Sequence, residues 1–316
     1  MNTRIHDPFD FGTHAGGPRA PHDAALSNDV LGPEFDNLPP ATPRPRPGAT
    51  AWLEDPAALT SRAPAGGLGP IPQSDRPTHG LALSDVRSML DDGRFWTEYQ
   101  AIVDARTGRT AGFEALGRFA ANDGTPVSPA KIFAILHADP ALLLRAELRL
   151  KFHQIEHAPD APLFVNLDAG SWNRAAHSHG NPFVGLISSA PRRVVVEITE
   201  TCVSDHALRA ADIVNSLREE GLTVALDDLG AVDALFSFDA VAGTDVLKFD
   251  RAVVARLRDR RCRALVQTLI RMTHDTGAYT VLEGIERPEE FALARELGFD
   301  FVQGYLFSDR THASEH

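Results

Sequence analysis

Short runs rich in β-branched and aromatic residues alternate with longer amphipathic stretches from Thr97 onward, and this alternation restricts the fold more than any other feature. We predict strands at Thr97–Asp104, Ala111–Phe119, Leu163–Leu167, Arg193–Thr199, Thr223–Asp227, Asp245–Phe249, Tyr279–Glu283 and Phe299–Tyr305. The longest predicted helices are Pro140–His157, His206–Gly221, Arg260–Thr276 and Pro288–Leu297. Strands that alternate with helices are typical of an α/β fold with parallel strands, so we expect a (β/α)8 TIM-like barrel.

The first two predicted strands must be connected differently from the others. Only Ala105–Thr110 separates them, which is too short for a helical crossover, so we expect this pair to be antiparallel. Upstream of this pair, Leu83–Leu90 has helical spacing, with Ser84 as the expected N-cap.

Residues 1–80 differ in composition from the rest of the chain. They contain most of the 22 prolines, together with many Gly, Ser and Asp residues. Proline lacks a backbone donor and is excluded from helix interiors and central strands, so we expect a disordered arm. We therefore divide the chain into the arm at 1–80, the barrel domain at 81–310 and a short tail at 311–316.

Charge and hydropathy restrict the partners. The net charge of −12 argues against binding to a nucleic-acid polymer, because such binding depends on many Lys and Arg side chains. No apolar run approaches the ~20 residues that span a bilayer, so we expect no membrane association. The chain contains only Cys202 and Cys262, and we expect no secretory leader and a cytoplasmic protein with reduced thiols.

Polar side chains end most of the predicted strands, where an apolar core would not tolerate them singly. They are Glu114, Asn166, Glu197, Asp227, Asp228, Lys248, Glu283 and Gln303. Burying unpaired charges costs on the order of several kcal/mol each, so we expect these groups to meet at the C-terminal rim, where such barrels place their active sites. Any one of them alone would be interpreted as a rim salt bridge or a helix cap, but the shared register favours a common site.

The composition of this set indicates the kind of ion. Carboxylates and an amide, without His or Cys, favour Mg²⁺ or Mn²⁺ over Zn²⁺. Five carboxylates exceed the need of one ion and suit two ions that share an aspartate, an arrangement that can activate water and bind a phosphate. Lys248 is placed to orient that water or to offset developing charge.

These residues resemble the motifs of the EAL family of cyclic di-GMP phosphodiesterases. The name motif is present as Glu114-Ala115-Leu116, followed by Gly117-Arg118-Phe119. Similar motifs occur in the family's order at Tyr99–Asp104, Phe164–Leu167, Val196–Glu200, Ala225–Gly230, Val246–Asp250, Leu282–Glu286 and Gln303–Phe307. So many motifs in one register make the resemblance highly specific, and it covers roughly Leu83 to Phe307.

The resemblance implies a role for each matched residue. Glu114, Asn166, Glu197 and Asp227 match the ligands of one metal ion, and Asp227, Asp228 and Glu283 match those of the second. Lys248 matches the lysine that positions the water and, with Asp228 and Glu283, is expected to be catalytic. Gln100, Leu116, Arg118 and Gln303 match positions that contact or support the substrate, and Glu200 matches a loop anchor. The implied activity is hydrolysis of cyclic di-GMP to linear pGpG, often by a homodimer.

The loop after the two aspartates departs from the family. Members usually continue with a Gly-Tyr-Ser-Ser type sequence, whereas Ala231–Phe236 contains neither glycine nor a hydroxyl side chain. This change leaves a second hypothesis open, a non-catalytic cyclic di-GMP receptor or protein-interaction module. A third hypothesis is another metal-assisted barrel enzyme, such as an enolase-like one. Phe236 and Phe238 beside the loop are either core residues or dimer contacts.

Overall fold

The computed structural model describes residues 81–175, 180–199, 207–231 and 237–314. The expected arm, Glu200 and most of the altered loop lie outside these residues. Helix α1 (Leu83–Asp91) opens the described chain, and its N-cap is Ala82 rather than the predicted Ser84. The reason is that Asp85, in the first turn, accepts a hydrogen bond from the Ala82 backbone N–H at 2.8 Å, so the helix begins earlier.

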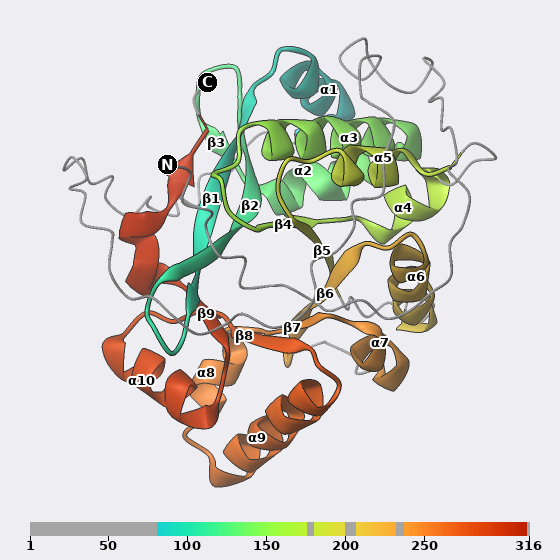
Figure 1. Cartoon of the computed structure of the whole chain (residues 1–316). Helices are drawn as coiled ribbons and strands as arrows, with labels where there is room; N and C mark the ends of the chain where they lie inside the picture. The colour runs from blue at the N-terminus through green and yellow to red at the C-terminus, as the bar shows by residue number, and fades with distance from the viewer. Residues whose placement is uncertain (1–80, 176–179, 200–206, 232–236, 315–316) are drawn as a thin grey trace, which may run out of the picture.

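The strands of the described chain close into a barrel (Figure 1). The ring consists of β1 (Phe95–Asp104), β2 (Thr110–Ala120), β4 (Leu163–Asn166), β5 (Val194–Thr199), β6 (Thr223–Leu229), β7 (Val246–Phe249), β8 (Tyr279–Leu282) and β9 (Phe301–Gln303). The strands β2, β4, β5, β6, β7, β8 and β9 pair in this order, and each pair is parallel. In contrast, β1 runs antiparallel to both β2 and β9. The predicted barrel with an antiparallel first strand is confirmed.

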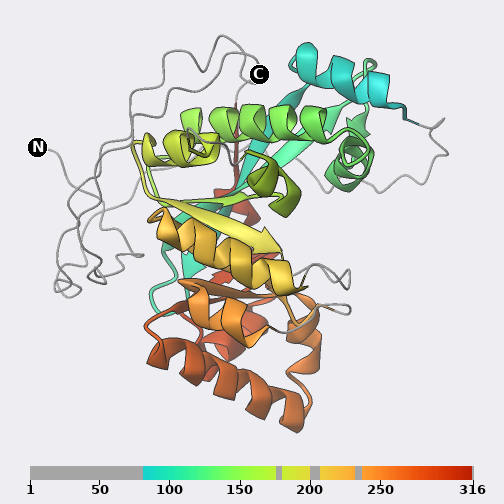
Figure 2. The same ribbon diagram turned by 90° about the vertical axis from the view of Figure 1, so that its right-hand side faces the viewer.

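Helices lie outside this ring (Figure 1). They are α2 (Pro129–Leu136), α3 (Pro140–Glu156), α4 (Ala169–Ala175), α5 (Pro182–Ser188), α6 (Ala207–Glu219), α7 (Phe238–Gly243), α8 (Ala252–Arg256), α9 (Arg260–Asp275), α10 (Pro288–Leu297) and the 3-10 helix η2 (Tyr305–Arg310). Two short strands, β3 (Pro126–Val127) and β10 (His312–Ala313), pair with β2 and β1 at the outer ends of the sheet. Figure 2 shows α1 and α9 at opposite ends of the molecule.

Two apolar regions hold the barrel together, because successive side chains of a strand point to opposite faces. In β5, Val194 and Val196 pack toward the helices, while Val195 points into the lumen. The lumen carries an apolar layer made of Ile102, Ala111, Phe164, Val195, Ala225, Val246, Val281 and Phe301. This layer fills the interior, so the barrel is a packed core and not a pore.

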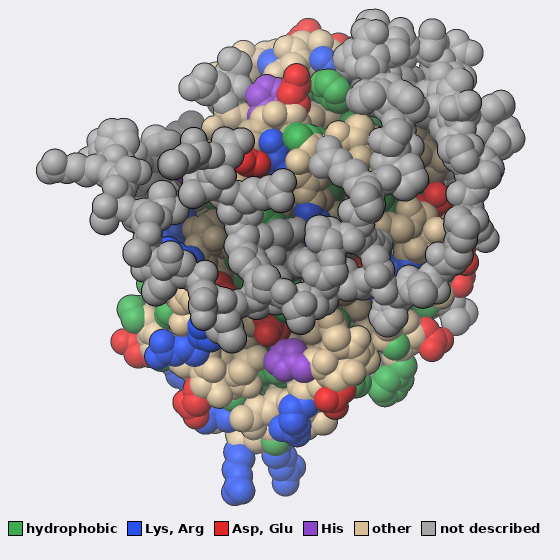
Figure 3. Space-filling model, in the orientation of Figure 1, with side chains coloured by type: hydrophobic (Ala, Val, Ile, Leu, Met, Phe, Trp, Pro, Cys, Tyr) green, Lys and Arg blue, Asp and Glu red, His purple; other side chains and the backbone are tan. Residues whose placement is uncertain are grey.

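The described surface carries few large apolar side chains. Phe238 is 73% exposed, and Leu265 and Tyr305 are also exposed, so Phe238 is not a core residue. Figure 3 shows positive and negative side chains interspersed on the lower, uncovered part of this face. Within the described ranges, no helix combines the length and the apolar character needed to cross a bilayer.

Candidate active site

A polar layer lies directly next to the apolar layer inside the barrel. After six of the parallel strands' apolar residues, the polar residue comes two positions later, so both point into the same lumen. The pairs are Phe164 and Asn166, Val195 and Glu197, Ala225 and Asp227, Val246 and Lys248, Val281 and Glu283, and Phe301 and Gln303. The polar layer is therefore at the carboxyl ends of the parallel strands, as predicted.

Lys248 lies at the centre of this layer. Its side chain is fully buried, and its Nζ lies 2.6 Å from Glu197 Oε1 and 2.7 Å from Glu283 Oε1. The same nitrogen lies 3.4 Å from carboxylate oxygens of both Glu114 and Asp227. One ammonium thus faces four carboxylates from four different strands, and the negative charge around it exceeds its own.

Burial and mutual repulsion shift the titration of these carboxyl groups. Burial raises the pKa of Glu197 well above its ordinary value, and the neighbouring Glu114 raises it further. Burial likewise raises the pKa of Asp227, of Glu283 to about 8 and of Asp228 to about 6. At Glu114, Lys248 and hydrogen bonds outweigh burial and lower the pKa. Four carboxyl groups therefore lack sufficient positive charge nearby.

Burial lowers the pKa of Lys248, but the surrounding carboxylates outweigh burial and raise it well above the ordinary value. Lys248 therefore remains an ammonium at neutral pH and acts as a hydrogen-bond donor, not as a base.

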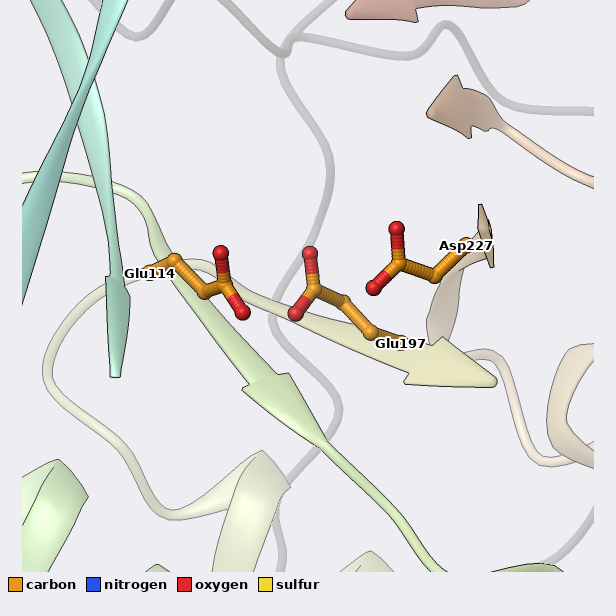
Figure 4. A group of neighbouring side chains, drawn as sticks. All are labelled: Glu114, Glu197 and Asp227. Carbon is orange, nitrogen blue, oxygen red and sulfur yellow. The ribbon is translucent and has the colours of Figure 1, made fainter. Parts of the chain in front are cut away.

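The acidic side chains fit a pair of divalent ions. Glu114, Glu197 and Asp227 form one group and Asp227, Asp228 and Glu283 form another, with the carboxylate oxygens of each group within 4.8 Å of one another. Figure 4 shows the first group, whose carboxylates point toward one another from β2, β5 and β6. Glu197 Oε2 is buried with no hydrogen-bond partner in the described chain, which is costly unless a cation binds it.

Asn166 belongs to the same group as Glu114. Its Nδ2 donates to Glu114 Oε1 at 3.0 Å, which aligns both side chains along one side of the site. All the carboxylates of both groups offer oxygen atoms, the kind of ligand that Mg²⁺ and Mn²⁺ prefer.

An irregularity in β6 places two successive carboxylates at the same site. In a regular strand, Asp227 and Asp228 would point to opposite faces. Here Asp228 has φ 62°, in the left-handed region, and the register with β7 shifts between Leu226 and Leu229. The Asp228 backbone N–H donates to Asp227 Oδ1 at 2.8 Å, which fixes this local turn. Both carboxylates therefore face the second candidate ion.

Gln303 connects the polar layer to the first strand. Its Nε2 donates to Glu114 Oε2 at 2.6 Å and to Gln100 Oε1 at 2.8 Å. The backbone beyond it is tightly packed, because a Cβ at Gly304 would lie 2.2 Å from the Ile285 carbonyl oxygen. Only glycine fits there, and this close approach holds the end of β9 against the site.

The hairpin of β1 and β2 extends one face of the site beyond the polar layer. Gln100 pairs with Glu114, Glu98 with Leu116 and Trp96 with Arg118. Leu116 and Arg118, the other predicted substrate contacts, are half-buried on this face. Arg118 Nε donates to Glu98 Oε2 at 2.5 Å. We did not single out Glu98 from the sequence, although its position two residues before Gln100 on the same strand indicates the same face.

The predicted residues that the structure describes thus lie in one continuous region. The polar layer gathers Glu114, Asn166, Glu197, Asp227, Asp228, Lys248, Glu283 and Gln303, with Gln100 hydrogen-bonded at its edge. Leu116 and Arg118 lie farther along β2. Glu200 and residues 232–236 are outside the described residues.

Comparisons with known proteins agree with this geometry. The sequence model of the EAL domain matches residues 83–310. An uncharacterized protein of Azorhizobium caulinodans is 32% identical over 234 residues, which are 66% of this chain and 30% of that protein. The cyclic di-GMP phosphodiesterase NbdA of Pseudomonas aeruginosa is 26% identical over 246 residues, 74% of this chain and 31% of that protein. The chain spans about a third of the length of the curated relatives it matches.

Solved structures show the same architecture. BlrP1 of Klebsiella pneumoniae, determined as a complex with manganese and cyclic di-GMP, superposes with a TM-score of 0.56 at 27% identity. The superposition covers 70% of this chain and 56% of that one.

Proposed function

Because the chain belongs to the EAL domain family, we propose that it hydrolyses cyclic di-GMP to linear pGpG with the help of two divalent ions, Mg²⁺ or Mn²⁺. The observation that carries this proposal is the pair of carboxylate groups that share Asp227 at the barrel mouth. The name of NbdA, a relative over most of the barrel, supports the same substrate.

We infer that the candidate ligands divide between the two ions. Glu114, Asn166, Glu197 and Asp227 would hold one, and Asp227, Asp228 and Glu283 would hold the other. When bound, such ions would activate a water molecule and neutralise charge on the phosphate. The carboxylate excess around Lys248 is the physical reason for this assignment, since bound cations would relieve the repulsion that raises the pKa values of these groups.

The reaction requires one bond to form and one to break. The water oxygen attacks one of the two phosphorus atoms, the P–O bond to the ribose 3′ oxygen breaks, and that oxygen takes up a proton. Lys248, whose Nζ lies among Glu197 and Glu283, is placed to orient the water by donating a hydrogen bond. Gln303 would hold Glu114 and Gln100 in place, and Arg118, with Leu116 beside it on β2, would contact the nucleotide.

A turnover assay tests this proposal. The purified full chain, incubated with cyclic di-GMP and Mg²⁺ or Mn²⁺, should release pGpG, and Glu114→Ala should reduce the rate by at least about 100-fold because it removes a ligand of one ion. Glu220→Gln, which removes an exposed carboxylate next to α6, is the matched control and should leave the rate unchanged. A native chain that binds cyclic di-GMP without cleaving it in either ion would instead establish a receptor.

We further propose that the chain acts as a homodimer. Support comes from the resemblance to the family, whose members often act as dimers, and Phe238 at the start of α7, which is 73% exposed, is the side chain that we place at the interface. Light scattering coupled to gel filtration should give twice the chain mass, and Phe238→Ser should lower the dimer fraction. A monomer at all concentrations up to about 100 μM would contradict the dimer without affecting the proposed reaction.

A further inference from the structure

The half-exposed face of the β1–β2 hairpin contains an acidic residue where a phosphate ligand would be expected. From Phe95 to Gln100, residues of β1 alternate between buried and half-buried, and Trp96, Glu98 and Gln100 are the half-buried ones. Gln100 is hydrogen-bonded to the buried polar layer through Gln303, so the face continues directly from the candidate ion site. Glu98 lies next along this face, paired with Leu116.

Glu98 accepts a hydrogen bond from one of the donor nitrogens of the Arg118 guanidinium. Arg118 Nε donates to Glu98 Oε2 at 2.5 Å, and Arg118 Nη1 donates to the Gly117 carbonyl oxygen at 3.2 Å. The side chains are 31% exposed for Arg118 and 38% for Glu98, so solvent reaches both. A carboxylate and a phosphate present similar oxygens to a guanidinium, and both form charge-assisted hydrogen bonds with it.

We propose that Glu98 is an affinity-determining residue that competes with the ligand phosphate for Arg118. This inference rests on the proposed function, because it takes cyclic di-GMP as the ligand. A phosphate reaches the Nε side of Arg118 only after the guanidinium leaves Glu98, and the freed carboxylate then repels the bound phosphate. Both effects weaken binding, and both disappear when the carboxylate becomes an amide.

The physical alternative is that Glu98 strengthens ligand binding. If Glu98 mainly holds Arg118 in the orientation that the ligand needs, its loss would disorder the guanidinium and weaken binding. The two roles therefore predict changes of opposite sign in one measurement.

Calorimetric titration of the full-length chain with cyclic di-GMP in Ca²⁺ provides this measurement. We expect Glu98→Gln to lower Kd by about three- to tenfold, the range for a solvent-accessible ion pair together with one nearby repulsive charge. Glu98→Ala should change Kd in the same direction. Glu220→Gln removes a distant exposed carboxylate and should leave Kd unchanged, which separates the local effect from that of net charge.

A double-mutant cycle identifies the route of the effect. In an Arg118→Ala background, Glu98→Gln should lose the part of its effect on Kd that comes from competition, because the guanidinium is absent, and should keep only the smaller part that comes from repulsion of the phosphate. Thermal unfolding of each variant verifies the fold. An unchanged or raised Kd for both Glu98 variants would overturn the inference while the proposed function stands. Absence of cyclic di-GMP binding by the native chain would overturn the proposed function itself.

Discussion

Asp228 combines a charged side chain with a strained backbone. Its φ of 62° lies in the left-handed region, which most residues other than glycine avoid, although Asp and Asn occur there more often than other types. This conformation brings the Asp228 carboxylate to the same side of β6 as that of Asp227. Local strain of this kind is concentrated at functional sites.

Two substitutions at Asp228 separate the effect of its backbone conformation on stability from the effect of its charge. Asp228→Asn and Asp228→Ala both remove the carboxylate, but only Asn retains tolerance for the left-handed region. We expect the Asn variant to have the higher free energy of unfolding, by about 1 kcal/mol, in urea titrations without added ions. Equal stabilities of the two variants would show that the local conformation carries no strain. Both variants should lose most of their Mn²⁺ affinity.

The raised pKa values at Asp228 and Glu283 predict the pH dependence of ion binding. Burial is the main cause of both shifts, which bring the pKa values to about 6 and about 8. Because an ion binds the ionised carboxylates, protons must leave before or as it binds. Mn²⁺ affinity should therefore rise as pH increases from about 6 to about 8, with proton release measurable by calorimetry in buffers of different ionisation enthalpy. An affinity that is flat over this range would contradict these shifts.

Helix α3 contains a buried ion pair that does not belong to the ion site. Lys151 Nζ donates to Glu147 Oε2 at 2.6 Å, one turn apart, and both side chains are almost fully buried. Burial raises the pKa of Glu147, and Lys151 only partly offsets this effect. Such a pair is costly to break but contributes little net stability compared with apolar residues of similar size.

Replacing one partner or both should therefore have different effects on α3. Lys151→Met leaves Glu147 buried without its partner, and we expect it to lower the free energy of unfolding by about 3 kcal/mol. The double variant Glu147→Leu/Lys151→Met should recover most of that loss. Urea unfolding of the three chains tests this, and a double variant as unstable as the single one would show that the pair itself stabilises α3.

The whole barrel couples ion binding to stability. In the ion-free chain, the raised pKa values of Asp228 and Glu283 favour the folded state at low pH. This contribution is complete below their ordinary pKa values of 3.8 and 4.5 and is lost as pH rises through about 6 and about 8. Bound ions counteract this loss, because they favour the ionised carboxylates.

Ion removal should therefore reveal the coupling at alkaline pH. At pH 8, Mn²⁺ at about 100 times its Kd at that pH should raise the unfolding midpoint by roughly 5–10 °C relative to EDTA, and the same Mn²⁺ concentration should give a smaller shift at pH 5.5, where Kd is higher. Glu283→Gln should reduce the shift at pH 8, since it removes a candidate ligand. An equal shift at both pH values would contradict the proposed link between ion binding and these carboxylates.

The sequence alone determined which segments along the chain form strands and which polar residues lie at the carboxyl ends of these strands. Both follow from local patterns, because the two-residue period of a strand and the burial of its apolar face are visible in a few neighbouring residues. The antiparallel first pair followed from the short Ala105–Thr110 connection. The prediction of Ser84 as the N-cap of α1 was wrong. The Ala82 backbone N–H donates to Asp85, so Ala82 is the N-cap, and the spacing of apolar residues does not distinguish these two starting points.

Only the tertiary structure showed which charged groups meet. Lys248 faces carboxylates from four strands because the ring closes around it, and closure depends on pairings between residues far apart in sequence. The left-handed backbone at Asp228 and the contact of Glu98 with Arg118 likewise depend on register and on neighbouring strands. A strand pattern shows which face a side chain occupies, but its partners on that face are decided by the assembled barrel.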